Sequence, residues 1–361
     1  MNTKQRGRAR AYIQHTPRRT GNKQQTTDNC MAIKTKLTEA TGIRIPVVQG
    51  GMMWVGRAEL ASAVSNAGGL GILTALTQPT PEDLRKEIRR CRTMTDKPFG
   101  VNLTLLPALI PPDYPAYCKV IIEEGIKIVE TAGNNPGPVI KTLKGSGIFI
   151  IHKCTAIRHA LSAQKLGVDM LSIDGFECAG HPGEDDVTGL ILLAIAARKL
   201  KVPYIASGGF GDGRGLAAAL ALGAQGINMG SRFMATAEAP IHPNIKQSIV
   251  KADERSTALL LRSYRNTTRM YKNEVAKEVV SRENQGVKFE GVRELVAGAR
   301  GKRVYEEGDD NAGVWTMGQV AGLIDDVPTC QVLLERIERE AEEIIAGNAK
   351  MLVGSGGKAK L

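Results

Sequence analysis

The stretch LSIDGFECAGHPG, residues 171–183, shows the pattern that decides the fold, an apolar run followed by a glycine-rich loop. Its apolar start, together with the preceding Val168, is typical of a buried β-strand, and the glycines and Pro182 that follow end regular structure. His181 is therefore predicted on a loop just beyond a strand end. Because the ordinary pKa of histidine is about 6.5, such a residue can act as a base near neutral pH, or it can merely cap a neighbouring helix. The stretch alone leaves both interpretations open.

This strand is one of eight apolar runs that alternate with helical patterns, an order typical of stacked βα units. The predicted strands cover residues 45–49, 70–75, 99–105, 126–132, 148–153, 168–174, 202–207 and 225–230. Helical patterns between them include residues 57–68, 81–94, 156–167 and 213–223. Eight units favour an α/β protein with a closed (β/α)8 TIM barrel. A doubly wound open sheet is the alternative, but no G-x-G-x-x-G motif follows any strand.

After the eighth strand the pattern changes, which predicts an addition to the barrel. Residues 236–312 are highly charged and read as an inserted, mostly helical subdomain, whereas 327–345 has the helical spacing of a last barrel helix. We therefore predict that the TIM barrel comprises residues 31–235 and 313–346. Residues 1–30 are predicted to be a disordered basic extension, and residues 347–361 a flexible tail.

Composition excludes several classes of function. Seven lysines and arginines without any acid lie within residues 1–27 and supply most of the net charge of +11. With only 4% aromatic residues, the chain lacks the basic, aromatic-bearing patches of nucleic-acid binders. The longest apolar stretch, residues 189–197, is too short to cross a bilayer. Six cysteines without a CxxC pair indicate a reduced, cytoplasmic protein.

In a TIM barrel the functional groups gather at the carboxyl ends of the strands, so the residues found there are candidates. They include Gly50, Gly51 and Met52 after the first strand, Asn102 in the third, Lys153 after the fifth, and Asp174 with His181 after the sixth. The seventh and eighth strands end in glycine clusters, SGGFGDGRG and NMGSRF. Loops at these two positions commonly bind phosphate through backbone N–H groups. Gly208, Gly209, Gly230 and Ser231 are placed for this, and Arg232 adds charge, although tight βα turns alone would also require glycine.

Six motifs occur in an order that resembles the nitronate monooxygenases, formerly called 2-nitropropane dioxygenases. They are IPVVQGGM, NAGGLGIL, FGVNLTL, DGFECAGHPGEDD, IASGGFGDGR and GAQGINMGSRFMAT, and the resemblance resumes at VWTMGQVAGLI, residues 314–324. It implies a TIM barrel that holds FMN noncovalently. Gly50, Gly51 and Met52 would lie against the flavin ring, Asn102 would hydrogen-bond it, and Gly208, Gly209, Gly230, Ser231 and Arg232 would bind its phosphate.

The resemblance also implies that His181 is the active-site histidine. This chain has Asp174 where many members have glutamine, and Cys178-Ala179-Gly180 where they have Ala-Gly-Gly. We include Lys153, Asp174, Ala179 and Gly180 among the predicted flavin contacts, with their roles left open. Glu177 either orients His181 or caps the next helix, and the second role is favoured. The cluster of Cys178, His181, Glu184, Asp185 and Asp186 lacks the paired spacing of zinc ligands, so no metal is predicted.

The implied activity is FMN-dependent oxidation of an alkyl nitronate, or of a nitroalkane, by molecular oxygen to a carbonyl compound and nitrite. The alternative is an NAD(P)H-dependent flavin reductase that acts on quinones or enoyl-acyl carrier substrates. A third interpretation is a flavin-binding protein without catalysis, for which Asp174 is the hint. The predicted partners are small molecules only, and whether the protein forms a homodimer is left open.

We predict that residues 1–30 contribute nothing to stability or activity, because their charged, Gln-bearing composition cannot bury a core. A shortened protein that begins at Met31 should match the full chain in flavin content, turnover and melting temperature. A melting temperature several degrees lower, or a loss of flavin, would mean that the extension docks on the folded domain.

Overall fold

Eight parallel strands close into a barrel in the computed structural model, which describes residues 33–105 and 111–352. The strands are β1 (Val47–Gln49), β2 (Gly71–Thr74), β3 (Phe99–Leu105), β4 (Ile128–Gly133), β5 (Phe149–Cys154), β6 (Met170–Asp174), β7 (Tyr204–Ser207) and β8 (Ile227–Met229). Strands β2 to β8 pair in chain order, and β8 pairs with β1 at Val48 and Asn228. A parallel bridge from Val48 to Leu70 then joins β1 to the start of β2. The predicted (β/α)8 barrel is confirmed.

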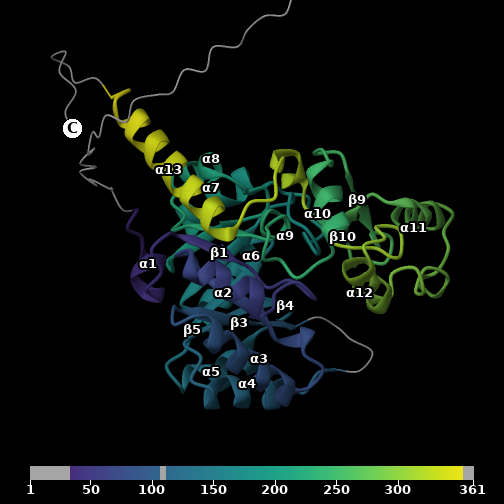
Figure 1. The fold of residues 1–361 in the computed structure, drawn as a ribbon, viewed down its shortest axis with the longest axis horizontal. Coiled ribbons are helices and arrows are strands. Elements are labelled where there is room, and N and C mark those ends of the chain that lie inside the picture. The colour runs from purple at the N-terminus through teal and green to yellow at the C-terminus, as the bar shows by residue number, and fades with distance from the viewer. Residues whose placement is uncertain (1–32, 106–110, 353–361) are drawn as a thin grey trace, which may run out of the picture. The chain divides into compact units, whose positions relative to one another are not determined.

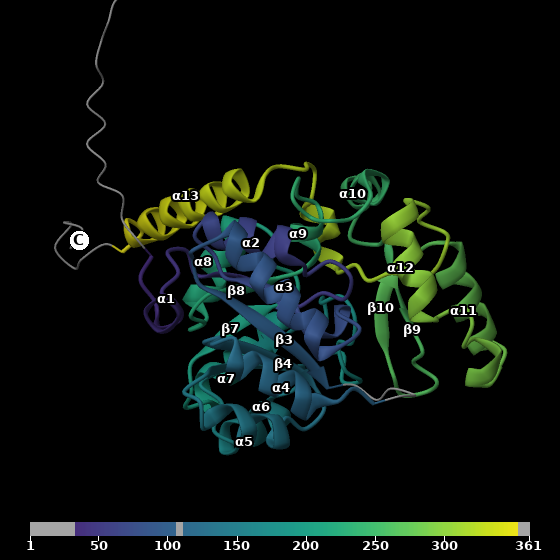
Figure 2. The same cartoon turned by 60° about the horizontal axis from the view of Figure 1, so that its bottom comes forward.

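A ring of helices surrounds the strands (Figures 1 and 2). It consists of α2 (Ala58–Asn66), α3 (Pro81–Met94), α4 (Tyr114–Glu123), α5 (Gly137–Lys144), α6 (Ile157–Lys165), α7 (Gly189–Lys199), α8 (Gly213–Ala221) and α13 (Cys330–Ala349). The last of these packs between α8 and α2, so it closes the ring as predicted from residues 327–345. It continues to Ala349, past the predicted start of the tail at 347. Residues 353–361 and the predicted extension 1–30 lie outside the described residues.

Three short helical segments complete the barrel domain. The helix α1 (Lys36–Thr41) precedes β1, the 3-10 turn η1 (Ala75–Thr77) follows β2, and α9 (Ser231–Met234) follows β8. The N-cap of α1 is Thr35, whose hydroxyl also donates to the Gln225 carbonyl oxygen at 2.7 Å. This contact ties the segment before β1 to the loop before β8, on the two sides of the barrel's closing seam.

The side chains inside the barrel change from apolar to polar along the strands. Toward the amino ends, the interior is filled by a fully buried apolar cluster that includes Val48, Ile72, Ile128, Ile151, Met170 and Ile205. Because successive side chains of a strand alternate between faces, the next inward positions on these and neighbouring strands lie one layer higher. There the buried side chains are Asn102, Glu130, Ser172, Asp174, Ser207 and Asn228. Polar chemistry is therefore built into the carboxyl end of the barrel.

The insert after β8 is mostly helical, as predicted, and also contains a hairpin that the sequence did not reveal. Its elements are α10 (Pro243–Val250), β9 (Thr257–Leu260), β10 (Thr268–Tyr271), α11 (Glu274–Asn284), η2 (Phe289–Gly291) and α12 (Gly298–Glu307), and η3 (Gln319–Leu323) follows. The strands β9 and β10 pair antiparallel. Their four-residue lengths are too short for a clear alternating pattern, so only the tertiary fold defines them. In Figure 2 the hairpin lies together with α11 and α12 beside the barrel.

Within the described residues, no helix is both long and apolar enough to span a membrane. The five cysteines of this part of the chain, Cys91, Cys118, Cys154, Cys178 and Cys330, are all buried and free. The fold therefore depends on packing rather than on disulfide bonds.

We predict that Gly71→Ala destabilises the barrel strongly, whereas Gly145→Ala does not. A Cβ atom at Gly71 would overlap the backbone of Ala61 in α2, which cannot move without shifting the helix. Overpacking of this kind typically costs roughly 1–3 kcal/mol, and a backbone clash should reach the upper end. At Gly145 the space is open and φ is −60°, so alanine fits there. Urea unfolding of both variants tests this, and equal midpoints would contradict it.

Candidate active site

A cavity of about 470 Å³ opens at the carboxyl ends of the strands. Its walls come from the loops after β1, β6, β7 and β8 and from residues 316–320. Most of the predicted site residues line it, namely Gly50, Gly51, Met52, Lys153, Ala179, Gly180, His181, Gly208, Gly209, Gly230 and Ser231. The size lies within the range of ligand and cofactor pockets. Three predicted residues, Asn102, Asp174 and Arg232, do not line this cavity.

On several sides the cavity is lined by glycines, which have no side chain. A Cβ atom at Gly50 would overlap the side chain of Asn228, and one at Gly51 would overlap Asn102. Gly208 has φ of +82°, which L-residues rarely adopt, and its backbone packs against Cys178. A Cβ atom at Gly230 would meet only the Met52 sulfur, at 3.6 Å. The wall is therefore mostly backbone, which suits a broad ligand whose polar groups are bound by N–H groups.

Glu130 is the centre of the polar layer below the cavity, and the sequence analysis missed it. Its carboxylate is fully buried and accepts hydrogen bonds from the Gly51 N–H at 2.9 Å, the Asn102 amide at 2.7 Å and the Asn228 amide at 2.8 Å. Asn102 thus points at Glu130, and its amide oxygen accepts from the Thr104 hydroxyl at 2.9 Å. The sequence signal for this residue is that Glu130 is the single acid within the mostly apolar run IKIVETA, residues 126–132. A buried carboxylate needs partners of this kind.

Lys153 and Asp174 form a buried ion pair beside this network. The two charged atoms lie 3.5 Å apart, and only Lys153 reaches the cavity. Burial alone would lower the pKa of Lys153, but Asp174 and Glu130 outweigh it and raise that pKa above its ordinary value. Burial raises the pKa of Asp174, and Lys153 opposes this shift. Lys153 therefore remains a cation at the cavity floor, and Asp174 acts on the cavity through it.

Arg232 lies beside the predicted phosphate loops but does not line the cavity, because its guanidinium is bound elsewhere. Its guanidinium donates to the Asp326 carboxylate at 3.1 Å and to the carbonyl oxygens of Ala235 and Asp326 at 2.7 and 2.8 Å. The side chain is 3% exposed, so these bonds compensate most of a buried charge, although the Nε–H has no hydrogen-bond partner among the described residues. Arg232 therefore fastens α9 to the segment before α13. Of the predicted phosphate residues, the four that line the cavity are Gly208, Gly209, Gly230 and Ser231.

His181 stands at the cavity on the loop after β6. Partial removal of solvent by the surrounding residues lowers its pKa, and the neighbouring Asn266 side chain and the charge of Glu184 partly oppose this shift. The imidazole is therefore mostly neutral at pH 7 and can accept a proton. Glu177 does not orient it, because its carboxylate accepts from the Gly189 N–H at 3.0 Å. The favoured prediction that Glu177 caps the next helix, α7, is confirmed.

The thiol of Cys178 also lines the cavity but is not a nucleophile. Burial raises the pKa of Cys178 to about 12, so almost none of it is thiolate at neutral pH. Among the described residues, no group of three histidine, cysteine or acidic side chains is arranged to hold a metal ion. His181 supplies an imidazole and Lys153 a cation at the cavity, which Glu177 and Tyr114 also line.

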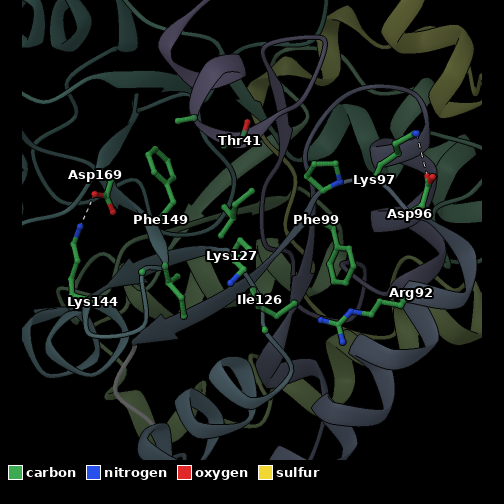
Figure 3. Close-up of a pocket in the computed structure, with 16 residues that line it drawn as sticks. Thr41, Arg92, Asp96, Lys97, Phe99, Ile126, Lys127, Lys144, Phe149 and Asp169 are labelled. Atoms are coloured by element: carbon green, nitrogen blue, oxygen red, sulfur yellow. Dashed lines mark hydrogen bonds and ion pairs between the residues drawn. The ribbon is translucent and has the colours of Figure 1, made fainter.

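A second cavity, of about 690 Å³, opens at the opposite end of the barrel (Figure 3). It lies at the amino ends of β3, β4 and β5, and Phe99 and Phe149 border it. Its cations are largely neutralised, since Lys144 pairs with Asp169 at 2.5 Å and Arg92 with Glu124 at 3.1 Å. This face of a TIM barrel serves stability rather than catalysis. None of the predicted site residues lies there.

Fold and site together define a class: an α/β barrel with a backbone-lined cavity at the carboxyl ends of its strands and a histidine at that cavity. The model of the family described as nitronate monooxygenase matches residues 34–340. The chain therefore belongs to the nitronate monooxygenase family, a family of flavin-dependent oxidoreductases.

Individual relatives carry different names. The chain is 33% identical, over 86% of its length and 97% of the relative's, to (3aS,4S,5R,7aS)-5-hydroxy-7a-methyl-1-oxo-octahydro-1H-indene-4-carboxyl-CoA dehydrogenase of Mycobacterium tuberculosis. It is 30% identical, over 86% and 96%, to a nitronate monooxygenase of Paraburkholderia phytofirmans. Among solved structures, FabK of Thermotoga maritima superposes with a TM-score of 0.83 at 36% identity, covering 89% of this chain and all of FabK.

We predict that Glu130→Ala lowers the free energy of unfolding by about 3–5 kcal/mol, the cost of removing one partner from a buried charged network. The Gly51 N–H and two amides would lose their acceptor, and Lys153 would lose one of its two carboxylates. Glu278→Ala is the control, because its exposed pair with Arg282 should contribute at most about 1 kcal/mol. Equal unfolding midpoints for the two variants would show that Glu130 is dispensable to the fold.

Proposed function

We propose that this protein oxidises alkyl nitronates with molecular oxygen, using FMN, and releases a carbonyl compound and nitrite. The observation that carries the proposal is the position of His181, a neutral base at a backbone-lined cavity, in a chain that the family model matches from 34 to 340. A nitronate is a delocalised anion, and Lys153 supplies a permanent positive charge at the floor of the same cavity.

The residues present fit FMN. The glycines after β7 and β8 leave open backbone for one phosphate, and any Cβ atom at Gly230 would project toward Met52. In this proposal Gly208, Gly209, Gly230 and Ser231 hold the phosphate, while Gly50, Gly51 and Met52 border the ring. Lys153, Ala179 and Gly180 complete the pocket, and Asn102 and Asp174 support it from below. Bound FMN would supply the electron-transfer and oxygen chemistry.

His181 has two roles in the proposed reaction. As the neutral imidazole it removes the α-proton from a nitroalkane and becomes a cation. That cation then stabilises the nitronate it has just formed, because the opposite charges attract each other. An ordinary histidine is half protonated at about pH 6.5 and mostly protonated below that pH. Because the pKa of His181 is lowered, its imidazole stays unprotonated to a lower pH and can still act as a base there.

A second candidate function is oxidoreduction of a thioester-linked substrate, with a nicotinamide nucleotide as the other reactant. It is favoured by the 33% identity to a relative named as a carboxyl-CoA dehydrogenase. Enoyl-acyl carrier substrates and quinones belong to the same alternative. Met53, which borders the cavity and is 45% exposed, gives the opening an apolar side chain.

Anaerobic stopped-flow mixing separates the candidates. The purified protein is mixed with a nitronate and, separately, with NADH or NADPH, and flavin absorbance is followed. Bleaching by the nitronate supports the proposal, bleaching by the nucleotide supports the second candidate, and no bleaching by either indicates a binding protein. The flavin released on heating should be FMN, and FAD in the supernatant would contradict the single-phosphate site.

We predict that His181→Asn reduces kcat/KM for a neutral nitroalkane by about 10²- to 10⁴-fold, the usual contribution of a general base. A pre-formed nitronate already lacks the α-proton, so the reduction of kcat/KM for the nitronate should be smaller. It should correspond to about 1.5–3 kcal/mol, the contribution of one charge-assisted hydrogen bond. The measurement compares both forms of one substrate in wild type and variant, normalised to flavin. Equal losses would leave His181 as an anion-binding group only.

A further inference from the structure

Arg269 of β10 is a buried cation behind one wall of the cavity. The residue is 3% exposed. Its backbone exchanges two hydrogen bonds with Gly180, of 2.6 and 3.1 Å, and its guanidinium donates to the Phe176 carbonyl oxygen at 2.9 Å. The residues between these two contacts, 177–180, line the cavity. The charge of Arg269 therefore lies directly behind this part of the wall.

The groups that bind this guanidinium are neutral. Besides the Phe176 carbonyl, the Thr257 hydroxyl of β9 accepts from it at 3.0 Å, and its central carbon lies 4.6 Å from the centre of the Phe176 ring. The Nε–H has no hydrogen-bond partner, and within residues 33–105 and 111–352 Arg269 forms no ion pair. A carbonyl, a hydroxyl and an aromatic ring stabilise a cation, but they carry no net charge that cancels it. The positive charge is therefore uncompensated.

The acids closest to Arg269 are bound to other groups. Glu177 accepts from the Gly189 N–H at 3.0 Å, at the start of α7, and Asp186 pairs with Arg262. Burial lowers the pKa of Arg269, but an arginine keeps its proton at neutral pH. A buried charge without a partner destabilises a fold, so its presence beside a cavity indicates a ligand of opposite charge.

We propose that Arg269 supplies positive charge that attracts an anionic substrate into the cavity, acting through the wall formed by residues 177–180. In the polar layer below the cavity, the carboxylates of Glu130 and Asp174 face the single cation Lys153, so that layer by itself repels an anion. Arg269 offsets this repulsion from the insert. The inference rests on the proposed function, because a nitronate is an anion whereas its parent nitroalkane is neutral.

The first test neutralises Arg269 without replacing it. Because the Thr257 hydroxyl accepts from the guanidinium, Thr257→Asp places a carboxylate beside the charge, and Thr257→Asn is the matched control of the same shape without charge. The FMN-bound proteins are titrated at pH 7 with propanoate, an anion, and with propanamide, its neutral counterpart, and Kd is read from the flavin absorbance. Wild type should bind propanoate more tightly than propanamide.

A unit charge that acts across a wall one residue thick, at an effective dielectric constant of about 20, changes affinity by roughly tenfold. Thr257→Asp should therefore weaken propanoate binding by about that factor and leave propanamide binding unchanged, whereas Thr257→Asn should resemble wild type with both. Equal propanoate affinities in the two variants, or a wild type that does not prefer propanoate, would overturn the proposal.

Two substitutions of Arg269 separate its charge from its hold on the wall. Arg269→Gln keeps an N–H donor for the Phe176 carbonyl but removes the charge, and Arg269→Lys keeps the charge but loses the planar fork. Propanoate binding should weaken by about tenfold in the first and change little in the second. Equal losses in both variants, for propanamide as well as propanoate, would mean that Arg269 only holds the loop, which would also overturn the proposal.

These binding measurements need no turnover, so they separate this inference from the proposed function. If propanoate affinity follows the charge but a nitronate does not bleach the flavin, the proposed function fails while the attraction of anions by Arg269 stands. If the nitronate bleaches the flavin but propanoate affinity ignores the charge, the proposed function stands and this inference fails.

Discussion

Closure of the barrel at Val48 is the constraint on which the rest of the structure depends. Val48 pairs with Asn228 on one side and bridges to Leu70 on the other, so the first strand joins the last to the second. A closed sheet has no free edge, and all of its strands end on the same rim. The loops after β1, β6, β7 and β8 are thereby brought around one cavity, although the residues they carry are spread over 180 positions of the chain from Gly50 to Gly230.

Closure also creates an interior that side chains must fill, and they fill it in two layers of different polarity. The lower layer, with Ile72, Ile151 and Ile205, is stabilised by burial of apolar surface, at about 25 cal/mol per Å². The upper layer contains two carboxylates, Glu130 and Asp174, against the single cation Lys153. Such charges are costly to bury, so the layer is held by multiple hydrogen bonds rather than by packing. The cost of burying these fixed groups is offset by the apolar layer beneath.

The sequence was a good guide wherever one pattern repeats. Eight apolar runs predicted the eight strands, and glycine clusters at strand ends predicted most of the cavity wall, because both are local properties. Side-chain direction was not predictable. Arg232 follows a phosphate-type loop yet turns to Asp326, which lies 94 residues later in the chain. In the sequence Glu130 is one residue of a predicted strand. Its role as the shared acceptor of the polar layer depends on Gly51, Asn102 and Asn228, which donate to it from three other parts of the barrel.

The insert is a second case in which the sequence did not predict the contacts that shape the candidate site. Its charged helices looked like a solvated surface, and much of that surface is so, with pairs such as Arg303 and Glu307 one helical turn apart. The part that contacts the candidate site is a hairpin of two four-residue strands, which are too short to predict; one of them pairs with Gly180. Since Gly180 has φ of +71° and precedes His181, the hairpin fixes a backbone conformation that few residues tolerate, next to His181. A barrel rim is built of loops, and a loop alone would leave His181 free to move. By pairing that loop with a strand, the insert gives it the hydrogen bonding of a sheet, and in this way an addition outside the barrel becomes part of the candidate site.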